Sequence, residues 1–112
     1  MYKEGKGVAQ NFAQAVNWYR KAADQGDAMA QNNLGGMYER GEGVAKDDVQ
    51  AAHWFREAAE QGDAVAQFNL GEMYEEGRGV TKDATQAAAW YRKAAEQGYA
   101  EADEVLRRME RR

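Results

Sequence analysis

Few residues in this sequence have the types and spacings that chemistry requires. The only histidine, His53, has no Asp, Glu or His near it at a metal-ligand spacing, which favours a solvated residue over a ligand. Glu72 and Glu76 are four residues apart, which puts two carboxylates on one side of a helix for acid–base work or cation binding. Their counterparts 36 residues earlier are Gly36 and Arg40, so we interpret the pair as part of a solvated helix surface.

Two glycine-rich segments, Gly41-x-Gly43 and Gly77-x-Gly79, could suggest phosphate binding. Each follows a predicted helix rather than a strand, and neither is followed by Lys-Ser or Lys-Thr, so neither fits a phosphate-binding loop. The chain has no cysteine, which excludes disulfides and thiolate-bound metals. We therefore predict no catalytic residue, no metal and no cofactor, and a hydrolase or transferase is the least favoured class.

Composition narrows the possible partners. The net charge is −4, which argues against a nucleic-acid surface, since such surfaces carry a basic stripe. No apolar run approaches the length of a membrane span, and the first residues contain no apolar segment typical of a signal peptide. We expect no membrane partner. The localisation stays open between the cytoplasm and, for a processed fragment, the periplasm or the exterior.

The positions of these residues are set by an internal repeat. Trp18, Trp54 and Trp90 are 36 residues apart, and residues 27–62 agree with residues 63–98 at 25 of 36 positions. Such self-similarity is the signature of a repeat array. We predict one domain over residues 1–112, made of a partial repeat, two full repeats and a capping helix, at residues 1–26, 27–62, 63–98 and 99–112.

Each repeat is predicted to form two helices, here called helix A and helix B. Helix A covers about 28–40 and 64–76, with Asp27 and Asp63 as N-caps, and helix B covers about 48–61 and 84–97, with Asp47 and Asp83 as N-caps. The first helix B is expected at 13–25. A single hairpin cannot bury the apolar faces of both helices, whereas stacked hairpins can. The predicted fold class is therefore all-α, an α-solenoid of about six helices.

The repeat resembles a known family. Residues 28–62 and 64–98 share the pattern Ala-x-Ala-Gln-x-Asn-Leu-Gly-x-Met-Tyr-x-x-Gly-x-Gly-Val-x-Lys-Asp, followed by Ala-Ala-x-Trp-Phe/Tyr-Arg-x-Ala-Ala-Glu-Gln-Gly. This pattern is similar to the Sel1-like repeat, a relative of the tetratricopeptide repeat. The resemblance implies a right-handed superhelix with helix A lining the concave side. It also implies an adaptor or scaffold role, in bacteria often in host contact or secretion-linked complexes, and no chemistry.

A candidate binding surface comes from the 11 positions at which the two full copies differ. Those in helix A are spaced three, four and four residues apart and form one helical stripe, which in the tetratricopeptide relatives faces the groove. With two asparagines that match a peptide-contacting position in those relatives, the candidate residues are Met29, Asn32, Asn33, Gly36, Arg40, Val65, Phe68, Asn69, Glu72 and Glu76.

The stripe combines apolar and acidic residues, as a binding surface for a basic peptide or protein would. We expect Met29, Val65 and Phe68 to be exposed on it. The alternative is that Met29 and Phe68 pack between adjacent A helices, and that Asn33 and Asn69 bond the backbone of a neighbouring helix.

The two ends of the array differ. The residues after Gly98 predict a terminal capping helix with acids early and arginines late, as the helix dipole favours. At the start, only Met1 to Glu4 remain of a helix A, so the apolar residues of the first helix B (Ala15, Trp18, Tyr19 and Ala22) should stay partly exposed. A homo-oligomer through this edge is the alternative function. The rival expectation is that Met1 and Tyr2 fold back over Trp18.

Overall fold

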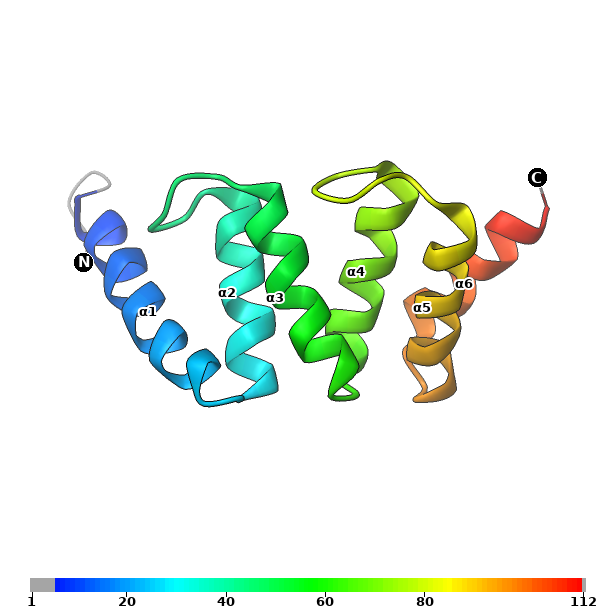
Figure 1. Cartoon of the computed structure of the whole chain (residues 1–112), viewed down its shortest axis with the longest axis horizontal. Helices are drawn as coiled ribbons and strands as arrows, with labels where there is room; N and C mark the ends of the chain where they lie inside the picture. The colour runs from blue at the N-terminus through cyan, green and yellow to red at the C-terminus, as the bar shows by residue number, and fades with distance from the viewer. Residues whose placement is uncertain (1–5, 112) are drawn as a thin grey trace.

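The structure, a computed structural model, describes residues 6–111 and contains six α-helices and no strand within them. The helices are α1 (Lys6–Asp24), α2 (Ala28–Arg40), α3 (Asp48–Glu60), α4 (Ala64–Glu76), α5 (Ala84–Glu96) and α6 (Ala100–Glu110). They stand side by side along a 47 Å axis, each packed against the next in the chain (Figure 1). The predicted all-α solenoid is confirmed. Within the described range, no helix is long and apolar enough to cross a membrane.

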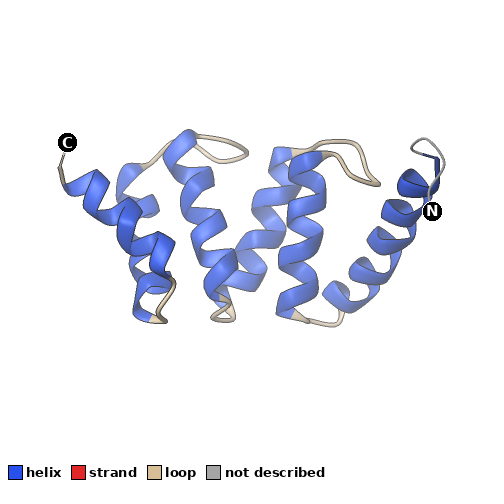
Figure 2. Cartoon of the chain, turned by 180° about the vertical axis from the view of Figure 1, so that it is seen from behind, coloured by secondary structure: helices blue, strands red, loops and turns tan. Residues whose placement is uncertain are grey.

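The helices alternate between the two predicted types. Helices α2, α4 and α6 are of the helix A type, and α1, α3 and α5 are of the helix B type, with long loops at one edge of the array and short turns at the other (Figures 1 and 2). The predicted N-caps are confirmed at all four positions. The side chains of Asp27 and Asp63 accept from the backbone N–H three residues on, and those of Asp47 and Asp83 do the same.

The first helix is longer than predicted. It begins at Lys6 rather than at residue 13. In the full copies the glycine loop is fixed by hydrogen bonds to the end of helix A, from Glu42 N to Met37 O and from Asp47 N to Tyr38 O. The first copy has no helix A among the described residues, and its backbone continues the helix instead. Met1 and Tyr2, which were expected to fold back over Trp18, lie outside the described residues.

The core contains many alanines, buried leucine and methionine side chains, and in each full hairpin one ring that is at most 1% exposed. Phe55 is 1% exposed and Tyr91 is 0% exposed. Each ring faces a glycine of its own helix A, because a Cβ at Gly35 or Gly71 would lie 2.8 Å from the ring carbons. These glycines let the two helices of a hairpin approach closely.

The recurrence of the tryptophans at the repeat spacing predicts that Trp54 and Trp90 are core residues, but in the structure the tryptophans lie at the rim of the core. Trp54 and Trp90 are partly buried against the core clusters, and Trp18 is 71% exposed. Successive residues of a helix point about 100° apart. The ring at the next position, Phe55 or Tyr91, therefore takes the place opposite the glycine.

Glutamine side chains join one hairpin to the next. Gln31 and Gln67, both buried, donate to backbone carbonyls of the preceding helix B, those of Ala23 and Ala59. Their side-chain oxygens accept from Gln61 and Gln97 at 2.7 and 3.0 Å. These bonds satisfy polar groups that would otherwise be buried without partners, and they join each helix A to the helix B before it and to the end of its own helix B.

Candidate functional site

The ten candidate residues of the predicted stripe lie on α2 and α4, and together they are called here the A-helix face. Neighbouring A helices meet directly on it, since Asn69 Nδ2 donates to Asn32 Oδ1 at 3.0 Å. This side-chain pair takes the place of the bond from Asn69 to helix backbone that was considered from the sequence. Asn33 is half-buried and lines a hollow between α1 and α2.

The apolar residues of the stripe do not all reach solvent. Met29 is 68% exposed and Val65 is 41% exposed, but Phe68 is only 8% exposed. The expectation that Phe68 is exposed is therefore wrong. Its ring packs with centroids 5.3 Å from that of Tyr91 and 5.2 Å from that of Tyr99. Packing against these two tyrosine rings removes more of the Phe68 ring from water than exposure on the stripe would.

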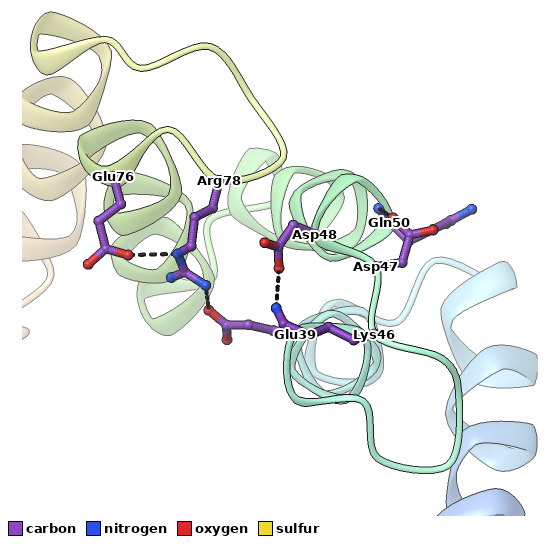
Figure 3. A network of polar contacts seen from close by, with 7 residues as sticks. All are labelled: Glu39, Lys46, Asp47, Asp48, Gln50, Glu76 and Arg78. Atoms are coloured by element: carbon purple, nitrogen blue, oxygen red, sulfur yellow. Dashed lines mark hydrogen bonds and ion pairs between the residues drawn. The ribbon is translucent and has the colours of Figure 1, made fainter.

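The charged end of the stripe has the same geometry in both copies but opposite signs. Arg40 Nε pairs with Glu42 at 2.8 Å in the first full copy, and Arg78 Nε pairs with Glu76 at 2.7 Å in the second. Because the loop residue of the second copy is the cation, it also reaches Glu39 of the preceding repeat at 2.8 Å (Figure 3). Gly36 is buried beneath the Arg40 guanidinium.

A hollow of about 460 Å³ opens between α4, α5 and α6. Its lining is mostly charged and consists of Glu72, Glu75, Glu76, Lys82, Tyr91, Val105 and Arg108. Sequence reasoning placed Glu72 and Glu76 among the candidate binding residues and did not include the other five. The signal for them was the exchange of Phe55 for Tyr91, which adds a hydroxyl beside Glu75, and the arginine at position 108 of the capping helix.

The glutamates of this hollow differ in how far neighbouring groups stabilise their negative charge. Glu75 accepts from the Tyr91 hydroxyl at 2.8 Å and pairs with Arg108 at 2.7 Å. Burial raises the pKa of Glu72, and the nearby negative charges of Glu76 and Glu39 raise it further. The ionised form of Glu72 is thus insufficiently stabilised by its surroundings, and a cation placed beside it would lower its pKa again.

The sequence profile of the Sel1 repeat matches residues 1–27, 28–63 and 64–99, which is nearly the whole chain. The chain belongs to the Sel1 repeat family. Proteins with Sel1 repeats are generally scaffolds that bind protein partners, and they are typically not enzymes. Within residues 6–111 the structure contains no group of three or more His, Cys, Asp or Glu side chains placed to hold a metal ion.

Solved Sel1-repeat structures resemble this chain closely. A protective antigen with this fold from uropathogenic Escherichia coli, c5321, is 52% identical over 88% of the chain, with a TM-score of 0.82. A Sel1 repeat protein from Oxalobacter formigenes is 46% identical over 73% of the chain, with a TM-score of 0.72. Helicobacter pylori cysteine-rich protein B is 30% identical over 81% of the chain, with a TM-score of 0.78. A comparison with curated proteins finds no match.

The chain corresponds to only part of some of these relatives. It spans 21% of the length of the E. coli antigen, 63% of the Oxalobacter protein and 68% of the Helicobacter protein. What the Sel1 repeats share with them is the scaffold of paired helices.

Proposed function

We propose that this Sel1-repeat chain is a protein-binding module whose A-helix face takes a basic, partly apolar segment of a partner protein. The observation that carries the proposal is the environment of Glu72. This carboxylate lines an open hollow and lies close enough to Glu76, Glu39 and Glu101 for their charges to raise its pKa. Arg78 already pairs with Glu39 and Glu76, so a Lys or Arg side chain of a partner would act mainly on Glu72, and exposed Met29 and Val65 add apolar contact.

The test is a nuclear magnetic resonance titration with two probes, a short peptide rich in Lys and Leu and its counterpart rich in Glu and Leu. We expect the basic peptide to shift amide resonances around Glu72, Glu76 and Arg108, and the acidic peptide to shift none. Binding should weaken with added salt, because the charges are accessible to solvent. Equal binding of both peptides, or shifts confined to the helix B face, would contradict the proposal.

A matched pair of variants distinguishes the loss of the binding site from a mere change in the net charge of the protein. Glu72→Lys should abolish the shifts. Glu57→Lys makes the same charge change on exposed helix B, where the other copy already has Lys93, and should leave them unchanged. Adding Phe68→Ala to Glu72→Lys would not give a clean test, because Phe68 is buried and its loss would destabilise the fold.

Self-assembly through the N-terminal edge is a second candidate, favoured by the 71% exposure of Trp18. We rank it second because helix α6 is a poor steric match for that edge. Head-to-tail docking would place α6 of one copy beside α1 of another, and α6 carries Arg107 where Gly35 and Gly71 admit a ring. Sedimentation of the unmodified chain tests it, and a monomer at high concentration would contradict it.

A further inference from the structure

The face of α1 that carries Tyr19 is only partly buried, although the same positions are fully buried elsewhere in the molecule. On α3 and α5 these positions are at most 1% exposed, at Ala51, Phe55, Ala58, Ala87, Tyr91 and Ala94. On α1 their counterparts Ala15, Tyr19 and Ala22 are all partly exposed. Each buried set lies against helix A of its own repeat, as the contacts of Gly35 and Gly71 show.

Beside this face is a hollow of about 210 Å³, lined by Phe12 and Tyr19 of α1, Asn33 and Arg40 of α2, and Glu42 of the following loop, among others. We call it the N-terminal seat. The positions 36 residues further along form the seat in which α2 lies. Three contacts hold α2 there, and each involves a counterpart of a residue of the N-terminal seat.

The first contact is steric, since Gly35 of α2 faces the ring of Phe55, the counterpart of Tyr19. The second is polar, from Asn69, the counterpart of Asn33, to Asn32 of α2 at 3.0 Å. The third is ionic, from Arg78, the counterpart of Glu42, to Glu39 of α2 at 2.8 Å. The N-terminal seat likewise has an aromatic ring, at Tyr19, and an asparagine, at Asn33. In place of the arginine it has a residue of opposite charge, Glu42.

We infer that the N-terminal seat binds an amphipathic helix of the helix A kind with three specific features. It has glycine opposite Tyr19, a hydrogen-bonding side chain opposite Asn33, and a basic residue facing Glu42. The basic residue follows from charge complementarity, because Glu42 stands where the interior seat has Arg78. A helix with glutamate at that position, as in α2 and α4, would bring two carboxylates together.

The helix α6 of a second copy meets the polar and the basic requirement, with Glu104 and Arg111 in register with Asn32 and Glu39, but it fails the steric one. It has an arginine in place of the glycine, at Arg107, and a Cβ at that position would lie about as close to the Tyr19 ring as the 2.8 Å found for Gly35 and Phe55. Such overlap with a packed ring forces side chains from their rotamers. Helix α6 of a second copy is therefore a poor steric fit for the N-terminal seat.

The experiment joins a copy of residues 28–36 ahead of Met1, which completes a 36-residue copy and puts Lys3 in register with Glu39. We expect the melting temperature to rise by several degrees. We also expect iodide to quench less of the tryptophan fluorescence, with Trp18→Phe identifying the protected share. The control is the same extension with arginine in place of the glycine that matches Gly35, which should give neither effect.

The charge requirement has its own test in the extended protein. Lys3→Glu should lower the melting temperature, and Glu42→Lys in the same chain should restore it. The inference is overturned if the extension is helical by circular dichroism but leaves iodide quenching unchanged. It is also overturned if the unextended chain dimerises with Trp18 protected, since a second copy would then be the occupant. If Lys3→Glu leaves the stability of the extended protein unchanged, the bound helix does not need a basic residue facing Glu42.

Discussion

The interior of this array and its N-terminal end contain the same residues in different surroundings. Phe55 and Tyr91 are among the most deeply buried side chains of the protein, whereas Tyr19, at the same position of the repeat, is partly exposed. Likewise, Trp18 is exposed whereas Trp54 is partly buried. Burial in a solenoid therefore depends on which neighbouring helix is present, and not on the residue or its place in the repeat alone.

The largest expected difference between these regions is in the cost of losing a ring. Phe55→Ala should lower the free energy of unfolding by about 3–5 kcal/mol, as for other buried aromatic residues. Tyr19→Ala should cost on the order of 1 kcal/mol or less, because a partly exposed ring has less surface to lose. Urea denaturation measures both. Equal losses would mean that the end of the array is packed like its interior.

The glycines of α2 should respond to alanine with opposite signs. Gly35→Ala puts a methyl group 2.8 Å from the Phe55 ring and should cost roughly 1–3 kcal/mol. Gly36→Ala meets the mobile end of Arg40 at 3.0 Å. It should stabilise the protein by about 0.5–1 kcal/mol, the usual gain for alanine over glycine in a helix. Thermal melts of both variants provide the measurement, and two changes of the same sign would be inconsistent with this packing.

The ion pairs of Arg40 and Arg78 should contribute unequally to the stability of the fold. Arg78 contacts carboxylates of two repeats, while Arg40 contacts Glu42 of its own repeat. Arg78→Ala should cost up to about 1 kcal/mol and Arg40→Ala a few tenths, within the range for exposed pairs. Both losses should shrink at high salt. If Arg40→Ala proved the more costly change in urea titrations, the bridge between repeats would not stabilise the array.

The smallest expected effect concerns Glu72. Its raised pKa means that the folded state disfavours the ionised form, so this group opposes folding at pH values above its folded pKa. Glu72→Gln should stabilise the protein at pH 7 by less than about 1 kcal/mol, because the site is partly solvated. The gain should vanish as the pH falls through the raised pKa and Glu72 becomes neutral. Glu57→Gln serves as the control and should leave the stability unchanged both at pH 7 and at the lower pH.

Much of the molecule was predictable from the repeat itself. The period of 36 residues, the capping aspartates and the alanine-rich faces led to the helices and to their order, because these depend on short-range hydrogen bonding and on the spacing of apolar residues. The candidate face was predicted less completely. Glu72 and Glu76 were identified by comparing the copies, whereas Tyr91, Val105 and Arg108 come from two further helices that only the stacking brings beside α4.

The sequence by itself determined that this protein is an array of helical hairpins, with variable residues along one side of helix A. Only the tertiary structure decided that Phe68 packs inward on Tyr91 and Tyr99, that Trp54 lies at the rim of the core, and that Asn32 bonds Asn69. The physical reason is that a stripe on one helix has two neighbours in a solenoid. Which of its residues face the next helix, and which face solvent, depends on how closely the glycines let those helices approach.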